Sequence, residues 1–156
     1  MKRITLLAVI AAGLAFGTLT SCSKEESKTS SSNTTTDARD LAVGTYTGIA
    51  VSTIDGDVST DTTTFTVSKG TGTTLNITED GLTFATSSVA VAGKDFAGNI
   101  PTQMLEFDGA NFTITGKGSN NQHFAFVESR KSFSYEIQIN GGPLSGSSVS
   151  VVGTKK

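Results

Sequence analysis

The stretch FSYEIQIN, residues 133–140, alternates apolar and polar side chains without a break. Its odd-numbered positions hold Phe, Tyr and two Ile, and its even-numbered positions hold Ser, Glu, Gln and Asn. A period of two places the four apolar side chains on one face of an extended strand, whereas a helix would need a period of 3.6. The stretch therefore predicts a β-strand with one buried face.

Shorter runs of the same kind occur along residues 41–156 and are separated by glycine, asparagine and aspartate clusters that are typical of turns. The runs are Tyr46–Val51, Thr62–Val67, Thr74–Thr78, Leu82–Ala85, Val89–Ala92, Met104–Phe107, Phe112–Thr115, His123–Val127 and Val149–Val152. The turn clusters include Asp80-Gly81 and Asn140-Gly141-Gly142. Some of these runs must merge or form loops, so we expect about eight strands.

The connections are short throughout, as hairpins require, so we predict an all-β, antiparallel up-and-down meander. A barrel is favoured over the alternative, a β-sandwich, because the chain has no tryptophan and only one cysteine and so lacks the Cys-Trp-Cys pattern of immunoglobulin domains. The barrel interior holds either packed side chains or one small ligand. Because a domain of this size needs its apolar burial for stability, we expect a filled interior.

One hairpin can be proposed in detail from its aromatic residues. Phe124 and Phe126 are predicted to pair with Ile137 and Tyr135, with residues 129–132 at the tip. This register places His123, the only histidine, on the outside.

Residues 1–21 are typical of a cleaved signal peptide. Met1-Lys2-Arg3 is positively charged, residues 4–16 are almost uniformly apolar, and small residues follow. The run is too short and too interrupted for a spanning helix. Leu19-Thr20-Ser21-Cys22 resembles the lipobox of bacterial lipoproteins, which implies that Cys22, the sole cysteine, carries acyl chains and becomes the first residue of the mature chain.

The residues after Cys22 bear on localisation. Ser23 is not the aspartate that retains lipoproteins in the inner membrane of many Gram-negative bacteria, which favours the outer membrane. Lys24, Glu25 and Glu26 resemble the short export signal of Bacteroidetes surface lipoproteins, which implies exposure at the cell surface. The alternative is the periplasmic face of the outer membrane, with these residues as a solvated charge cluster.

Residues 22–40 are rich in serine and threonine, and we expect a disordered tether there. About 18 such residues reach on the order of 20 to 25 Å as a coil. Residues 41–156 are large enough for one domain with a single core. The mature chain keeps 10 of the 12 basic and all 14 acidic residues, a formal net charge of −4. This charge makes nucleic acid an unsuitable partner, because its recognition begins with neutralised phosphates.

The two ends of the domain carry a further resemblance. Gly44-Thr45-Tyr46-Thr47-Gly48 and the terminal Gly153-Thr154-Lys155-Lys156 are similar to the ends of the lipocalin-like, or calycin-like, β domains of Bacteroidetes surface lipoproteins. The resemblance implies the same barrel fold. It departs from true lipocalins at Tyr46, where they carry tryptophan.

Catalytic and metal-binding patterns are weak. His123 has no serine and aspartate at a recognisable spacing, and the acid pairs Glu106 with Asp108 and Glu79 with Asp80 are typical of solvated strand edges and turns. We therefore expect no catalytic site and no cofactor.

The residues Asp55, Asp57, Ser59 and Asp61 have the alternate oxygen spacing of a calcium loop, but Thr60 and Thr66 stand where the EF-hand pattern requires glycine and glutamate. An acidic hairpin loop is the favoured interpretation, with calcium as the alternative. Asp61-Thr62-Thr63 resembles the acceptor motif of Bacteroidetes O-glycosylation, which implies a glycan on Thr62. The alternative is a threonine-rich start of a strand.

Three functional classes follow. The first is a membrane-anchored, non-catalytic β domain that binds a glycan, a small apolar molecule or a protein. The second is a structural or accessory subunit of an outer-membrane complex, which an exposed hydrophobic patch would favour. The third is a hydrolase, which would need His123, a serine and a carboxylate in one cleft.

We predict that Cys22→Ser prevents cleavage of the leader before residue 22 and moves the protein out of the membrane fraction, because serine cannot form the thioether to diacylglycerol. Cell fractionation and the mass of the mature chain test this. A Cys22→Ser protein that still needs detergent for extraction would contradict the lipid anchor.

Overall fold

The structure is a computed structural model that describes residues 37–89, 93–142 and 144–156. It contains one short α-helix, α1 (Arg39–Ala42), and one 3₁₀-helix, η1 (Glu128–Arg130). The strands are β1 (Gly44–Ile54), β2 (Asp57–Lys69), β3 (Leu75–Glu79), β4 (Leu82–Ala85), β5 (Phe96–Gly98), β6 (Gln103–Phe107), β7 (Ala110–Gly116), β8 (Phe124–Val127), β9 (Ser132–Asn140) and β10 (Ser148–Lys155). Within these residues no helix is long and apolar enough to cross a bilayer.

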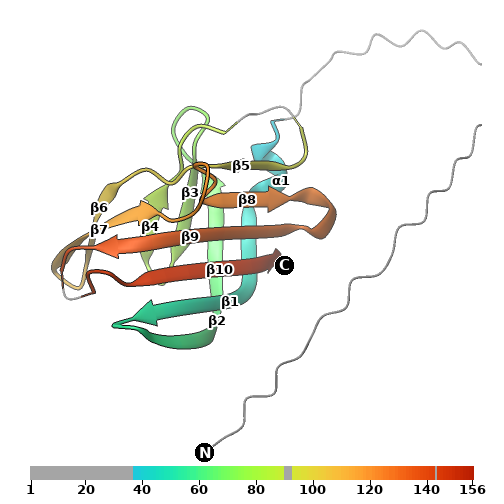
Figure 1. Ribbon diagram of the computed structural model, residues 1–156. Coiled ribbons are helices and arrows are strands. Elements are labelled where there is room, and N and C mark those ends of the chain that lie inside the picture. Colours follow the sequence, from blue (N-terminus) through green and yellow to red (C-terminus); the bar gives the residue numbers. More distant parts are fainter. Residues whose placement is uncertain (1–36, 90–92, 143) are drawn as a thin grey trace, which may run out of the picture. The chain divides into compact units, whose positions relative to one another are not determined.

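All strand pairs are antiparallel and belong to one sheet. The order β4-β3-β2-β1-β10-β9-β7-β6 curls into a half-barrel, and β8 and β5 extend the sheet beside the first half of β9 (Figure 1). The first and last strands are neighbours, in register from Tyr46 opposite Lys155 to Thr53 opposite Ser148. The prediction of an all-β antiparallel meander is confirmed, and one continuous curled sheet replaces the alternative of a two-sheet sandwich.

The two end strands of the sheet, β4 and β6, are joined by a side chain. The Gln103 amide accepts a hydrogen bond from the Ala85 N–H at 2.9 Å and donates one to the Ala85 carbonyl at 2.8 Å. The Gln103 side chain thus makes the pair of bonds that a neighbouring backbone would make in a ladder. We call this junction of β4 and β6 the seam.

The half-barrel has two different ends. The end that carries α1 and the last residues of β10 is called the α1 end. The opposite end, called the open end, carries the β1–β2, β3–β4 and β6–β7 turns and the β9–β10 loop (Figure 1). Because each strand runs antiparallel to its neighbour, successive turns alternate between the two ends.

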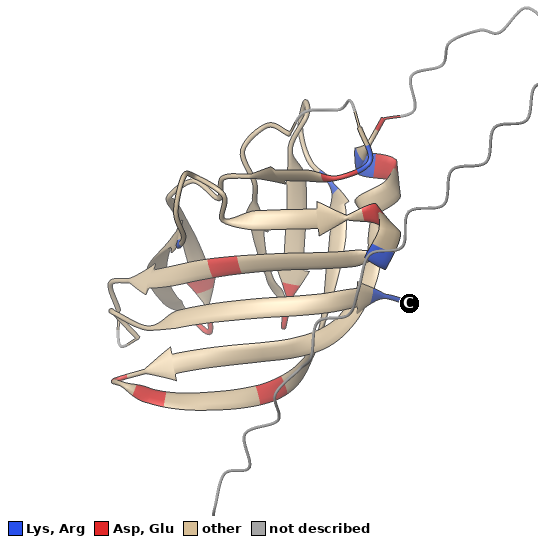
Figure 2. Ribbon diagram, turned by 45° about the vertical axis from the view of Figure 1, so that its right-hand side comes forward, with Lys and Arg blue, Asp and Glu red and all other residues tan. Residues whose placement is uncertain are grey.

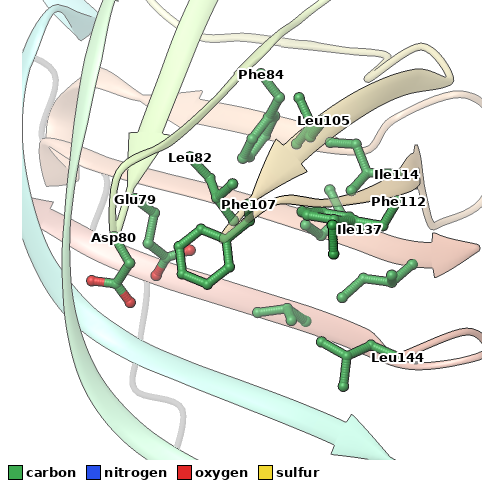
Figure 3. Close-up of a pocket in the computed structure, with 13 residues that line it drawn as sticks. Glu79, Asp80, Leu82, Phe84, Leu105, Phe107, Phe112, Ile114, Ile137 and Leu144 are labelled. Atoms are coloured by element: carbon green, nitrogen blue, oxygen red, sulfur yellow. The ribbon is translucent and has the colours of Figure 1, made fainter. Parts of the chain in front are cut away.

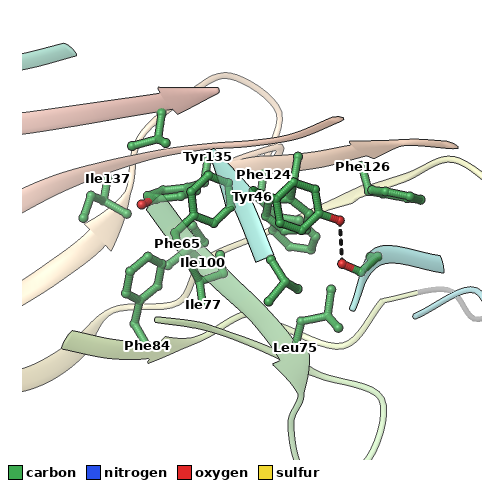
Figure 4. Close-up of a cluster of buried hydrophobic side chains, with 14 of the residues drawn as sticks. Tyr46, Phe65, Leu75, Ile77, Phe84, Ile100, Phe124, Phe126, Tyr135 and Ile137 are labelled. Carbon is green, nitrogen blue, oxygen red and sulfur yellow. Dashed lines mark hydrogen bonds between the residues drawn. The ribbon is translucent and has the colours of Figure 1, made fainter. Parts of the chain in front are cut away.

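An aromatic cluster fills the interior on the α1 side (Figure 4). Tyr46 and Phe65 stack with ring centroids 5.2 Å apart, and Phe124 and Phe133 stack at 5.7 Å. Tyr135 closes the cluster, edge-on to Phe65 at 5.3 Å. Fully burying one such apolar side chain stabilises the fold by roughly 1.5–3 kcal/mol.

Two paired glycines make room for that cluster. Gly48 of β1 lies opposite Gly153 of β10. A Cβ on Gly153 would lie 2.6 Å from the Phe65 ring and 3.1 Å from the Tyr46 Cβ. A Cβ on Gly48 would lie 1.9 Å from the Val152 carbonyl oxygen. The Phe65 ring therefore packs directly on the β10 backbone.

Two details of the strand prediction are wrong. Phe124 pairs with Tyr135 and Phe126 with Phe133, two positions away from the predicted register. A shift of two residues keeps the same side chains on the inner face, so the pattern alone could not fix it. The predicted strand Val89–Ala92 is not formed at Val89, and residues 90–92 lie outside the described residues. The three-residue strand β5 is found instead.

The domain begins earlier than predicted. Residues 37–40 were assigned to the tether, but Ala38 is fully buried and Arg39 is nearly so. The Arg39 guanidinium donates to both Asp37 carboxylate oxygens and to the Gly72 and Thr74 carbonyls. These hydrogen bonds from Arg39 hold the pKa of Asp37 well below its usual range.

The contacts of α1 also explain the correction. Lys69 forms ion pairs with Asp37 at 3.2 Å and Asp40 at 2.6 Å, and the Tyr46 hydroxyl donates to the Ala42 carbonyl at 2.5 Å. The segment 37–40 is polar, so it resembles a linker in composition. Besides the local pair of Asp37 with Arg39, its charges are satisfied by Lys69 and by the Gly72 and Thr74 carbonyls, about 30 positions away, which local composition does not reveal.

We predict that Arg39→Ala lowers the unfolding midpoint by several degrees, because the Gly72 and Thr74 carbonyls and the Asp37 carboxylate lose their donor together. Thermal unfolding followed by circular dichroism measures this. Arg130→Ala, at the exposed β8–β9 connection, is the matched control and should leave the midpoint unchanged. Equal midpoints for both variants would show that α1 is not part of the cooperative unit.

Candidate ligand-binding cavity

A cavity of about 330 Å³ occupies the open end of the half-barrel (Figure 3). Small-molecule sites in proteins commonly measure about 300–1,000 Å³. Eleven of its thirteen lining residues are apolar: Leu82, Phe84, Leu105, Phe107, Ala110, Phe112, Ile114, Ile137, Ile139, Leu144 and Val149. The other two are Glu79 and Asp80.

Strand alternation brings these apolar side chains together. Ile137 and Ile139 continue the inner face of β9 beyond Tyr135, and the adjacent strand β7 contributes Phe112 and Ile114 to the same face. Ile114 lies directly opposite Ile139 in the sheet. The stretch that decides the fold thus also forms one wall of the cavity.

The prediction of a filled interior is therefore wrong for the open end. Ile114 and Phe84 are buried at the bottom of the cavity, and Phe112 is half-buried. Near the rim, Phe107 is 51% exposed and Leu144 is 44% exposed. Phe84, Ile114 and Ile137 thus belong to the hydrophobic core and also line the cavity.

A polar group marks the boundary between the core and the cavity. The Tyr135 hydroxyl donates to the Glu79 Oε2, and the Thr63 hydroxyl donates to the Glu79 Oε1 at 2.5 Å. Burial, together with the adjacent Glu79 carboxylate, raises the pKa of Tyr135 far above its usual value. The Tyr135 hydroxyl thus stays protonated and fixes the orientation of the Glu79 side chain.

The lipoprotein residues Cys22, Lys24, Glu25 and Glu26 lie outside the described residues, as do the signal peptide and most of the predicted tether. Their roles stay predictions. The remaining candidates from the sequence are all described.

The calcium candidates do not form a loop. Asp55 and Gly56 make a two-residue turn with positive φ at both positions, and β2 starts at Asp57. Ser59 and Asp61 therefore lie in an extended strand and are exposed, rather than in the longer acidic loop that was predicted. Within residues 37–89, 93–142 and 144–156, no three His, Cys, Asp or Glu side chains gather as metal ligands would.

Other single candidates are on the surface. Thr62 is an exposed residue of β2, not of a loop, and a glycan there stays a prediction. Glu106 lies in β6 and Asp108 in the following turn, and both are exposed.

His123 lies outside the cavity but is only half-exposed. Its Nδ1 accepts a hydrogen bond from the Ile100 N–H at 3.3 Å. Ser134, Glu136 and Ser150 share a shallow hollow with it on the outer face of the sheet. The Glu136 carboxylate, however, pairs with Lys117 at 3.3 Å. His123 and Glu136 thus contact Ile100 and Lys117, whereas the relay of a hydrolase would need hydrogen bonds from a serine to a histidine and from the histidine to a carboxylate.

The cavity residues were not identified as a site from the sequence. The interior was expected to be filled by packed side chains, so its apolar residues were not singled out as a site, and Glu79 was assigned to a solvated strand edge or turn. One signal was available: on the inner face of residues 133–140, Ile137 and Ile139 follow the aromatic residues Phe133 and Tyr135, so this face extends beyond the aromatic cluster.

Comparisons of the chain with protein-family models, with curated proteins and with solved structures gave no match.

We predict that the two tyrosines, the only ones in the chain, ionise only as the domain unfolds. An unfolded tyrosine has a pKa of about 10, whereas burial raises the pKa of Tyr46 to about 12 and that of Tyr135 further. Between these values the unfolded chain has lost protons that the native domain keeps, so the free energy of unfolding falls as the pH rises above about 10.

Ultraviolet absorbance of tyrosinate and far-ultraviolet circular dichroism, followed together during alkaline titration, measure this. The two transitions should coincide, and Tyr46→Phe should leave a single titrating group. Ionisation near pH 10 with native circular dichroism would show that the hydroxyls are accessible to solvent.

Proposed function

We propose that this chain is a lipid-anchored protein of the outer membrane whose half-barrel domain binds a small, predominantly apolar ligand. The observation that carries the proposal is the cavity at the open end, with its eleven apolar lining residues. Phe107 and Leu144 expose apolar surface at its rim, and a ligand would remove that surface from water.

The composition of the cavity supports one of the ligand classes predicted from the sequence. A glycan needs hydrogen-bonding side chains around it, and apart from Glu79 and Asp80 the cavity wall has none. An apolar molecule fits that wall better. The cavity is also concave and about the volume of a small molecule, which suits such a ligand better than a protein surface.

The arrangement of the two ends supports the anchored role. The chain enters the domain at Asp37 and α1, which are at the end opposite to the cavity (Figure 1). With Cys22 lipidated, the tether would join the domain at the α1 end and leave the cavity at the open end unobstructed. Surface exposure, implied by Lys24, Glu25 and Glu26, would then present the cavity to the medium.

One observation favours the alternative function, an accessory subunit of an outer-membrane complex. Ile49 of β1 and Val152 of β10 lie directly opposite each other on the outer face of the sheet, and both are exposed. Val51 and Val58 extend this patch along β1 and β2. An exposed apolar patch of this kind suits contact with another protein.

We predict that decanol binds in the cavity and that Leu105→Trp weakens its binding at least tenfold, because the larger ring occupies the space next to β7. The protein used is the chain from residue 23 onward, which keeps the described domain and needs no detergent. Isothermal titration calorimetry measures the affinity, and the unfolding midpoint of each variant checks the fold.

Met104→Trp is the matched control, since Met104 is the preceding residue of the same strand, points to the outer face and is 73% exposed. It should bind decanol as the unchanged chain does. A folded Leu105→Trp protein with unchanged decanol affinity would show that the cavity is not the site.

A further inference from the structure

The cavity carries negative charge and no positive charge. Glu79, at the end of β3, and Asp80, in the β3–β4 turn, are the two charged residues that line it. Figure 3 shows their carboxylates at one side of the cavity, beside the Phe107 ring. Glu79 is half-buried, whereas Asp80 is exposed.

The Glu79 carboxylate is held in place but is not neutralised. Its two hydrogen bonds come from the Thr63 and Tyr135 hydroxyls, which are uncharged. Among the described residues, no Lys, Arg or His nitrogen lies within 4.0 Å of Glu79 or Asp80. A carboxylate offers about four lone-pair positions, so the Glu79 oxygens can accept further hydrogen bonds from a ligand.

The charge of the whole open end has the same sign. The segments that form it, residues 51–63, 77–84, 103–114 and 137–150, contain no Lys, Arg or His. They contain seven acidic residues: Asp55, Asp57, Asp61, Glu79, Asp80, Glu106 and Asp108. Figure 2 shows acidic residues along this end of the strands and most of the basic residues near α1 and the C-terminus.

The acidic residues of β2 face the interior. Asp61 lies opposite Ala50, and Asp57 lies opposite Ile54, in an unbroken register that also pairs Phe65 with Tyr46. Residues an even number of positions apart share a face of a strand, so Asp57 and Asp61 lie on the same face as the buried Phe65. The concave side of the half-barrel therefore has the apolar cavity wall and, on β2, two exposed carboxylates outside the cavity lining.

This arrangement has an energetic consequence. A carboxylate next to apolar walls loses part of its hydration, and a cation in contact with it compensates for that loss. The attraction is stronger there than in water because the surroundings have a lower dielectric constant. An anionic ligand in the same place would be repelled by Glu79 and Asp80.

We propose that the cavity selects a cationic amphiphile, in which an alkyl chain occupies the apolar cavity and a protonated amine contacts Glu79 and Asp80. This inference rests on the proposed function and adds the charge of the ligand. At roughly 30 Å³ for each non-hydrogen atom, as in liquid water, 330 Å³ holds an alkyl chain of about ten carbons.

The test compares decylamine, decanol and decanoate, which share one chain and differ in head-group charge. Isothermal titration calorimetry on the chain from residue 23 onward, at neutral pH and low ionic strength, gives the three affinities. Decylamine should bind at least about tenfold more tightly than decanol, the size expected for a charge-assisted hydrogen bond. Decanoate should bind more weakly than decanol. Added salt should reduce the preference for the amine.

Two variants assign the preference to the carboxylates. Glu79→Gln should remove most of the preference for decylamine, measured as the ratio of the decylamine and decanol affinities of the same variant. Asp80→Asn provides a second variant that does not affect the Tyr135 contact, and asparagine tolerates the positive φ of this turn position. It should weaken decylamine binding in the same direction. Glu106→Gln, which makes the same change of charge on an exposed residue that does not line the cavity, is the matched control and should have less than a twofold effect.

The outcomes separate the two proposals. Equal affinity for decylamine and decanol, or tighter binding of decanoate, overturns the charge inference and leaves the apolar site standing. A preference for decylamine that survives both Glu79→Gln and Asp80→Asn overturns it as well. Binding of none of the three compounds overturns both the inference and the proposed function.

Discussion

The packing of Phe65 on the bare backbone of Gly153 is the constraint on which the rest of the structure depends. A side chain at Gly153 would occupy the place of the Phe65 ring, which stacks on Tyr46 and meets Phe133 and Tyr135 edge-on. These contacts tie together β2, β1, β10 and β9, the four central strands of the sheet. They also concentrate the large rings toward the α1 end. The space beyond Tyr135 is bounded by aliphatic side chains and by Phe84, Phe107 and Phe112, and the cavity lies there.

Tyr135 connects the core with the site. Its ring packs against Phe65 and Phe84, and its hydroxyl holds the Glu79 carboxylate. A single residue therefore separates a half of the interior that stabilises the fold from a half that is available to a ligand. The same division runs through the charges, because the α1 end pairs Asp37 and Asp40 with Arg39 and Lys69, whereas the acidic residues of the open end have no basic residue among their own segments. The proposed binding of an apolar molecule, and of a cationic one in particular, follows from this division.

The sequence predicts the sheet well and the site poorly, for one physical reason. Strand alternation is a local property, so the inner face of residues 133–140 and most strands could be derived from neighbouring residues. Other features depend on residues that lie far apart in the chain: the pairing register, the role of Arg39, and the contact between Glu79 and Tyr135. Glu79 and Tyr135 are 56 positions apart. The pattern also predicts burial for every phenylalanine on an inner face. In the structure, Phe65 packs in the core, whereas Phe107 lies exposed at the rim of the cavity. Which of them meet a partner is decided by the curl of the sheet, which the pattern does not contain.

The seam at Gln103 gives the cavity one wall that is easier to displace than the others. Elsewhere around the half-barrel, neighbouring strands are held by ladders of backbone hydrogen bonds, but β4 and β6 meet through the two bonds of one amide side chain. Leu82 and Phe84 on one side of the seam, and Leu105 and Phe107 on the other, line the cavity. Separating β4 from β6 breaks these two bonds and leaves every strand pair of the sheet intact, and the next contact along the junction is the hydrogen bond from the Ser87 N–H to the Asn99 carbonyl at 2.8 Å. For the proposed binding of a ligand, the volume of the empty cavity would then be a lower bound on the size of the molecule, because this junction could widen.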